Sequence, residues 1–328
     1  MNIRQEREML ERQLLAPYAF FSEHSRGRQR EEEPCDIRTA FARDRDRIIH
    51  SKAFRRLKHK TQVFISLDND HYRTRLTHTL EVAQIARTIA RAVRLNEDLT
   101  EAISMGHDLG HTPFGHAGEK ILDELSPHGF HHYEQSLRVV DVLENDGRGL
   151  NLTHEVRNGI VNHTGKALAD TMEGIVVKYA DRFAYINHDI DDALRAGILT
   201  EEDIPYEFKE ILGDSHSGRI DTLIRDLVGE TRIRGEVTMT AKVEETMLAL
   251  RQFMFEHVYG ALATRDGQAE MVIERLYRYF ISHTEKLPAE YKALLKDWDA
   301  QTVVCDYIAG MTDYYSIHLF EDLFMPIH

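Results

Sequence analysis

The spacing of apolar side chains along the chain predicts helices over most of its length. From His78 to Val93, apolar residues recur at intervals of three and four, as they do on the buried face of an amphipathic helix. Asn96 is placed to cap the next helix, which turns Leu99 inward and ends near Gly106. Seven prolines and few β-branched runs favour helix elsewhere too. The pattern therefore predicts an all-α fold.

Further helices are predicted on the same grounds in both halves of the chain. One stretch is less clear, because residues 220–239 contain a short run of Thr, Ile and Val that also suits a short hairpin. An acidic hinge is expected at residues 201–207. The remaining predicted helices cover 117–125, 134–144, 154–162, 175–194, 219–228, 241–262, 269–284 and a final segment from Gln301.

Composition narrows the classes of protein that fit. The chain has 328 residues and a formal charge of −14, which argues against broad electrostatic binding to nucleic acid or to an acidic membrane. No apolar run approaches a membrane span, and the N-terminal stretch lacks the apolar core of a secretory signal. We therefore expect a cytoplasmic protein without a membrane partner. In that setting Cys35 and Cys305 are expected to be free thiols.

The charge is unevenly distributed along the chain. Between Asp36 and Arg94 there are 14 basic and 6 acidic residues, although the whole chain is acidic. The histidines are skewed as well, since 13 of the 19 precede residue 166. A solvated basic helix face would explain the first observation equally well. If the basic segment lies near the histidines, it suits a small anionic ligand.

Four residues offer the mixed nitrogen and oxygen ligands of a divalent-cation site. His107 and Asp108 are adjacent at a predicted helix end, where flanking glycines let neighbouring side chains converge. His78 begins one predicted helix, and Asp181 lies inside another. These imidazoles and carboxylates suit Mn²⁺, Mg²⁺, Co²⁺, Fe²⁺, Ni²⁺ or Zn²⁺ without choosing among them. A His-Asp dipeptide alone is common, so this prediction depends on the residues around it.

The segment after Asp108 contains a candidate acid-base pair. His116 and Glu119 are three residues apart at a predicted helix start, so both lie on one face. A carboxylate that holds one ring nitrogen fixes the tautomer of an imidazole and raises its basicity, as a general acid or base requires. The same spacing fits an ordinary ion pair on a helix surface.

A second helix presents a polar face of its own. Asp181, Tyr185 and Asp189 recur at intervals of four, which aligns a carboxylate, a phenol and a second carboxylate. Arg182 stands beside them, where a guanidinium would balance phosphate charge. An exposed polar stripe has this spacing too, but apolar residues such as Phe183 on the other faces indicate a helix buried on more than one side. The face therefore suits a polar ligand.

These motifs closely resemble those of the dGTPase-like deoxynucleotide triphosphohydrolases, a group within the HD phosphohydrolase superfamily. The His…His-Asp…Asp pattern identifies only the superfamily, whereas the long block that begins at Arg38 is specific to the group. The matching blocks are Ser25 to Arg28, Arg38 to Ser51, Phe54 to Leu57, Lys60 to Phe64, Arg75 to Ala83, His107 to Glu119, His132 to Ser136, Tyr179 to Arg182 and Asp306 to Asp313.

The resemblance implies a fold and an activity. The fold would be an HD-type helical fold with additional C-terminal helices. An N-terminal segment (1–35) would precede a catalytic core (36–200), with a mainly helical region (201–328) packed on it as one compact unit. The reaction would convert a dNTP and water into a deoxynucleoside and inorganic triphosphate. Relatives assemble as tetramers or hexamers, so we expect a homo-oligomer. Some respond to nucleotides or single-stranded DNA, which leaves nucleic acid as a weak effector at most.

The resemblance also implies roles for individual residues. One divalent ion per subunit would be held by His78, His107, Asp108 and Asp181, and His116 with Glu119 would form the catalytic dyad. The substrate-binding positions would be Arg75, His132 and Arg182 at the triphosphate, His111 at the reaction centre, Gln62 and Asp189 at the 3′-hydroxyl, and Tyr185 where a ribose 2′-hydroxyl would clash.

The chain departs from its relatives at two positions. Tyr133 replaces a common Asn, and Tyr314 replaces a common Arg, which removes a cation from the C-terminal segment. Residues 203–296 carry no motif that we can assign, so base preference is not predicted.

Two other functions fit the same residues less well. One is an HD phosphohydrolase of nucleoside monophosphates or cyclic nucleotides, in which His111 and His116 serve a second ion. The other is a nucleotide sensor with weak catalysis, although such a protein needs no acid-base pair.

Overall fold

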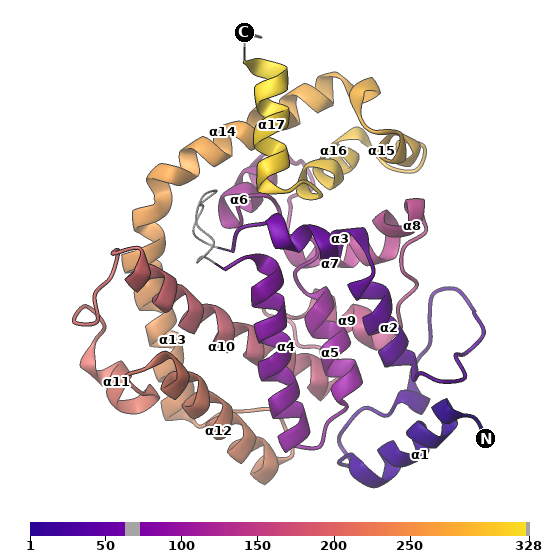
Figure 1. The fold of residues 1–328 in the computed structure, drawn as a ribbon, viewed down its shortest axis with the longest axis vertical. Coiled ribbons are helices and arrows are strands. Elements are labelled where there is room, and N and C mark those ends of the chain that lie inside the picture. The colour runs from indigo at the N-terminus through magenta and orange to yellow at the C-terminus, as the bar shows by residue number, and fades with distance from the viewer. Residues whose placement is uncertain (63–72, 326–328) are drawn as a thin grey trace. The chain divides into compact units, whose positions relative to one another are not determined.

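The structure, a computed structural model, describes residues 1–62 and 73–325, with the backbone only at 259–266. Within these ranges the chain forms helices and two isolated bridges, Arg28 with Thr153 and Thr61 with Thr74, and no β-strand (Figure 1). The all-α prediction is confirmed. No described helix is both long enough and apolar enough to cross a membrane.

The chain divides into two compact units, and unit 1 comprises Met1–Asp46, His78–Met105 and Leu152–Leu262. Its longest helix, α10 (Met172–Arg195), packs against α9 (His154–Val161), α12 (His216–Arg234) and α13 (Ala241–Met254). The other helices that lie wholly or mainly in this unit are α1 (Ile3–Leu14), α2 (Ala40–Ile49), α4 (Arg75–Ala92), α5 (Glu97–Gly106) and α11 (Tyr206–Leu212).

The predicted apolar stripe of α4 is part of the core of unit 1. Its members Val82, Ile85 and Ile89 are each at most 2% exposed. The Asn96 side chain caps α5 as predicted, because its oxygen accepts a hydrogen bond from the backbone N–H of Leu99 at 3.2 Å. Periodicity and capping chemistry therefore located these two helices correctly.

The hairpin considered for residues 220–239 is wrong. Helix α12 continues through this stretch to Arg234 and ends at Gly235, whose φ of 73° is left-handed. Leu223, Leu227 and Thr231 follow one another at intervals of four and are buried. Burial of that stripe outweighs the β propensity of the few Thr and Ile residues.

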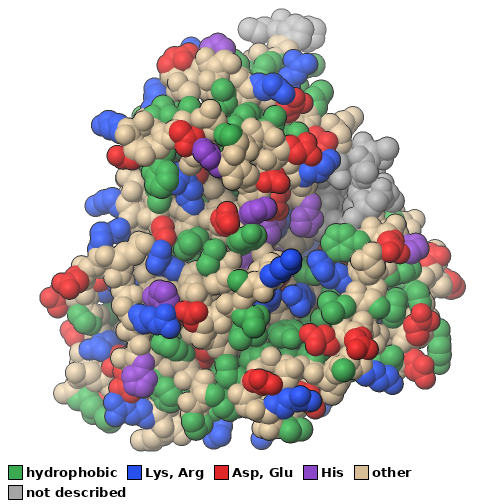
Figure 2. All heavy atoms as spheres, turned by 180° about the vertical axis from the view of Figure 1, so that it is seen from behind, with side chains coloured by type: hydrophobic (Ala, Val, Ile, Leu, Met, Phe, Trp, Pro, Cys, Tyr) green, Lys and Arg blue, Asp and Glu red, His purple; other side chains and the backbone are tan. Residues whose placement is uncertain are grey.

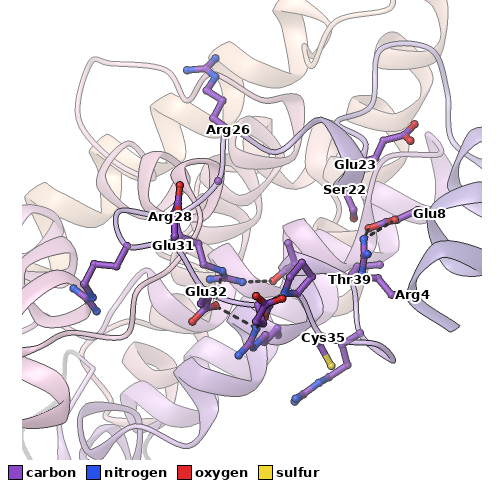
Figure 3. Close-up of a pocket in the computed structure, with 17 residues that line it drawn as sticks. Arg4, Glu8, Ser22, Glu23, Arg26, Arg28, Glu31, Glu32, Cys35 and Thr39 are labelled. Carbon is purple, nitrogen blue, oxygen red and sulfur yellow. Dashed lines mark hydrogen bonds and ion pairs between the residues drawn. The ribbon is translucent and has the colours of Figure 1, made fainter. Parts of the chain in front are cut away.

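The N-terminal segment of unit 1 surrounds a cavity of about 820 Å³ (Figure 3). Most of its lining is charged, with arginines opposite glutamates. Arg4 lies 2.7 Å from Glu8, and Arg28 lies 2.8 Å from Glu32. Because these charges compensate one another, the cavity does not present an uncompensated cationic surface to an anion.

Unit 2 comprises Arg47–Thr77, Gly106–Asn151 and Ala263–His328. Its hydrophobic core includes Leu122 of α6, Ile273 and Leu276 of α14, and Val304 and Ile308 of α16, all fully buried. The helices of this unit are α3 (Lys52–Arg56), α6 (His116–Leu125), α7 (His132–Arg138), α8 (Glu144–Gly147), α14 (Gly260–Ser282), α15 (Ala289–Leu294), α16 (Ala300–Ala309) and α17 (Asp313–Phe324).

The predicted final helix from Gln301 is two helices. Helix α16 ends before Gly310, where an added Cβ would lie 2.8 Å from the hydroxyl of Tyr291. Thr312 then caps α17 by accepting a hydrogen bond from the backbone N–H of Tyr315. The chain therefore leaves the helix between Gly310 and Thr312, and the threonine cap begins the second helix.

Two further predictions concern cysteines and surface charge. Cys35 and Cys305 are both free thiols, as predicted, and burial raises the pKa of Cys305 to about 12.

On the face drawn in Figure 2, Lys and Arg side chains are interspersed with Asp and Glu. This face therefore does not carry the continuous basic surface that nucleic-acid binding favours.

Candidate active site

The predicted His-Asp pair lies in unit 2, directly after the end of α5. His107 is fully buried and Asp108 is 3% exposed, and His107 Nε2 lies 3.6 Å from Asp108 Oδ1. The helix ends at Gly106, so neighbouring side chains are free to approach each other. Both groups are thus held as neighbours in a dry environment.

Asp108 is surrounded by positive or polarisable nitrogen groups. Arg75 donates a hydrogen bond to its Oδ2 at 2.9 Å, and His111 Nε2 lies 3.2 Å from its Oδ1. Burial alone would raise the pKa of Asp108, but His111, His107 and Arg75 outweigh burial and hold it well below its usual range. The carboxylate is therefore charged at neutral pH.

His111 and His132 stack in the same unit, with ring centroids 3.9 Å apart. Burial lowers the pKa of His111 strongly, and Arg75 and His132 lower it further, so its ring is neutral at pH 7. Asp108, His111 and His132 each place one ligand atom within 4.8 Å of the others. This carboxylate and these two imidazoles suit a divalent cation by their chemistry.

Glu119 of α6, one member of the predicted dyad, lies near both His116 and His132. Its Oε2 lies 3.8 Å from His116 Nδ1. His132 is closer, because its Nδ1 and its backbone N–H each lie 2.9 Å from Glu119 Oε1. Burial alone would raise the pKa of Glu119, yet the neighbouring imidazoles of His116 and His132, the latter hydrogen-bonded to it, outweigh burial and lower the pKa. Glu119 therefore orients His132 at least as firmly as it orients His116.

Arg75 and Gln62 lie in unit 2, next to the loop that contains Gly115. Arg75 is 1% exposed and donates a hydrogen bond to the backbone oxygen of Gln62 at 3.3 Å. The side-chain oxygen of Gln62 is buried and has no hydrogen-bond partner within residues 1–62 and 73–325. An added Cβ at Gly115 would lie 2.9 Å from the Gln62 carbonyl, so only glycine permits this approach.

The remaining predicted residues lie in unit 1, on α4 and α10. His78 Nε2 lies 3.1 Å from Asp181 Oδ1, and the histidine is 1% exposed. Asp189 is buried on the same helix as Asp181. Burial raises the pKa of Tyr185 to about 12, so its hydroxyl keeps its proton. The four predicted metal ligands thus occur as two pairs, His107 with Asp108 in unit 2 and His78 with Asp181 in unit 1.

The structure adds two residues of unit 1 that we did not predict. His188 is 2% exposed, its Nδ1 lies 3.2 Å from Glu81 Oε2, and its ring is edge-on to His78 at 6.3 Å. Helical spacing in the sequence could have predicted both residues. Glu81 follows His78 by three residues and His188 follows Asp181 by seven, so each shares a helix face with a predicted ligand.

Comparison with known proteins identifies the class. Residues 75–186 match the family model of the HD domain, a range that includes all four predicted metal ligands. Residues 237–322 match the model of the phosphohydrolase-associated domain. The second match covers much of the stretch in which we assigned no motif.

Curated relatives match over almost the whole chain. A deoxyguanosinetriphosphate triphosphohydrolase-like protein from Caldanaerobacter subterraneus subsp. tengcongensis is 58% identical and covers 99% of this chain and 97% of its own. Proteins of the same name from Clostridium tetani and Desulfatibacillum aliphaticivorans are each 48% identical, covering 99% of this chain and 97% and 99% of their own. The chain therefore belongs to the family of deoxyguanosinetriphosphate triphosphohydrolase-like proteins.

Proposed function

We propose that this protein hydrolyses deoxynucleoside triphosphates, dGTP among them, to a deoxynucleoside and inorganic triphosphate. The observation that carries the proposal is the 58% identity, over 99% of the chain, to the deoxyguanosinetriphosphate triphosphohydrolase-like protein of Caldanaerobacter subterraneus subsp. tengcongensis. The array of Asp108, Arg75, His111 and the half-buried His132 supports it, because it combines a charged carboxylate, a guanidinium and two imidazoles in the way that a phosphate substrate and a cation require.

We propose one divalent ion per subunit, with His78, His107, Asp108 and Asp181 as its ligands. The donor set fits, since imidazole nitrogens and carboxylate oxygens without thiolate suit Mn²⁺, Mg²⁺, Co²⁺, Fe²⁺, Ni²⁺ and Zn²⁺. When bound, such an ion neutralises phosphate charge and lowers the pKa of a bound water. Asp108 is already a carboxylate at neutral pH, so it needs no deprotonation to bind a cation.

The predicted catalytic and substrate-binding side chains have separate tasks in the proposed reaction. Water attacks the α-phosphorus and the bond to the 5′-oxygen breaks, so that the water oxygen stays on the triphosphate. His116, held by Glu119, donates a proton to the leaving 5′-oxygen. Its imidazole is 72% exposed, which leaves it free to reach a bound nucleotide. Arg75, His132 and Arg182 offset the charge of the triphosphate, and His111 lines the reaction centre as a neutral imidazole.

The proposed sugar contacts follow from hydrogen-bonding capacity. The Gln62 side-chain oxygen, which has no hydrogen-bond partner among the described residues, is an acceptor for a 3′-hydroxyl, and the buried Asp189 carboxylate is a second acceptor. Tyr185 would exclude a 2′-hydroxyl by its bulk. We therefore expect dGTP to be hydrolysed and GTP to be left intact.

The experiment that tests this function incubates the purified protein with each dNTP, singly and mixed, in the presence of several divalent metals. Chromatography of the products is expected to show a deoxynucleoside and triphosphate. Pyrophosphate, orthophosphate or no product would contradict the proposal. Light scattering on the same sample tests the homo-oligomer that we also propose, and a monomer would contradict it.

A second candidate function is supported by one observation. Asp108, His111 and His132 are arranged as a possible cation site in their own right, which suits a two-metal phosphohydrolase of nucleoside monophosphates or cyclic nucleotides. Metal analysis distinguishes the two functions. One ion per chain with triphosphate release supports the first function, whereas two ions with hydrolysis of a nucleoside monophosphate or a cyclic nucleotide support the second.

A further inference from the structure

The loop that carries His111 and leads to His116 has a conformation that its own sequence does not favour. Phe114 has a φ of 61° and Gly115 a φ of 57°. A positive φ is unusual for a bulky aromatic residue, because its Cβ crowds the backbone, so neighbouring groups must hold it there. Phe114 is 5% exposed and packs in the core of unit 2.

One carboxylate of the C-terminal helix α17 fixes this turn. Asp313 Oδ1 accepts a hydrogen bond from the backbone N–H of Phe114 at 3.0 Å, and its Oδ2 accepts one from the backbone N–H of Thr61 at 2.9 Å. Asp313 is 2% exposed and is the first residue of α17, where a negative charge is favourable. Both of its oxygens are thus used to hold backbone groups from two other segments.

The buried amino group of Lys60 fixes the other end of the same loop. Lys60 is 2% exposed, and its Nζ donates hydrogen bonds to the backbone oxygens of His111 and of Ala309, the latter at 2.6 Å. Ala309 is the last residue of α16, where carbonyl oxygens lack partners within the helix and need a donor from outside it. Lys60 therefore joins the His111 backbone to the end of α16.

We propose that Asp313 and Lys60 are positioning residues, through which the C-terminal helices α16 and α17 set the placement of His111 and His116. All of these residues belong to unit 2. The inference gives a task to the phosphohydrolase-associated region, which includes α16 and most of α17. It deepens the proposed function and rests on it, because His111 and His116 are assigned to the reaction there.

Substitution of Asp313 tests the proposal. Asp313→Asn keeps the size of the side chain but points an NH₂ group at one of the two backbone N–H groups. Asp313→Ala removes both contacts. Because misplacement by about 1 Å costs on the order of 10²-fold in turnover, we expect Asp313→Asn to lower kcat about 10- to 100-fold with KM within about threefold. Asp299→Ala is the matched control, since Asp299 caps α16 through the N–H of Thr302 and pairs with His128, which lies outside the loop.

Hydrogen exchange separates this inference from the proposed function. Backbone amides of residues 108–119 are expected to exchange faster in Asp313→Asn than in the wild type, and to be unchanged in Asp299→Ala. If the wild type hydrolyses no nucleotide, the proposed function fails, yet this exchange comparison still decides the inference. Wild-type exchange in Asp313→Asn, a loss of kcat without faster exchange, or equal effects in Asp299→Ala would each overturn the positioning role.

Discussion

Glu173 is a buried carboxylate in the first turn of α10, and it makes the stability of unit 1 dependent on pH. Its Oε1 accepts hydrogen bonds from the backbone N–H groups of Phe20 and Asn96 at 2.9 and 3.0 Å. Its Oε2 is buried without a hydrogen-bond partner within the described ranges. Burial raises the pKa of Glu173 from 4.5 to about 7, against the lowering effect of the backbone hydrogen bonds.

The sign and size of the effect follow from this pKa. Below pH 4.5 the carboxyl is protonated in both the folded and the unfolded chain. Between pH 4.5 and 7 the unfolded chain loses the proton while the folded chain keeps it, so the free energy of unfolding falls as the pH rises. A shift of about 2.5 units, at about 1.4 kcal/mol per unit, gives a total loss of roughly 3 kcal/mol, complete just above pH 7.

The variant Glu173→Gln cannot ionise and is expected to lack this loss. We expect its free energy of unfolding, measured by urea denaturation and circular dichroism at pH 5, 6, 7 and 8, to fall less than that of the wild type by roughly 2.5 kcal/mol over the series, because part of the loss has already occurred at pH 5. Thr171→Ala, which removes the N-cap of the same helix, is the control. It should lower stability by about 1 kcal/mol at every pH and keep the wild-type slope. Parallel curves for Glu173→Gln and the wild type would refute the reasoning.

Three further predictions concern the candidate site and its loop. His116→Ala should lose most turnover while metal content, measured by atomic emission, stays that of the wild type; His128→Ala, which removes a similarly exposed histidine paired with Asp299, should keep full activity. Tyr185→Ala should raise the rate of GTP hydrolysis relative to dGTP, and an unchanged ratio in competition assays would remove Tyr185 from sugar selection. Gly110→Ala should lower the unfolding free energy by more than about 2 kcal/mol, because the new Cβ would lie 2.1 Å from the backbone nitrogen of Ser136; a melting temperature within 1–2 °C of the wild type would contradict this.

Much of the local structure was predictable because it depends on neighbours within one or two turns. The stripe of α4 and the Asn96 cap of α5 follow from spacing and capping chemistry. The hairpin considered for residues 220–239 was wrong, since only the tertiary fold reveals that Leu223 and Leu227 are buried. β propensity is a weak preference that such burial overrides.

The sequence by itself determined the helical fold, the family and the residue types of the candidate site. These depend on periodicity and on motifs whose members lie close together along the chain. Only the tertiary structure decided which groups fix those motifs in place. Asp313 reaches Phe114 across 199 residues, and Lys60 reaches Ala309 across 249. No local pattern encodes such pairs, because the contact exists only after the C-terminal helices have packed into the core of unit 2.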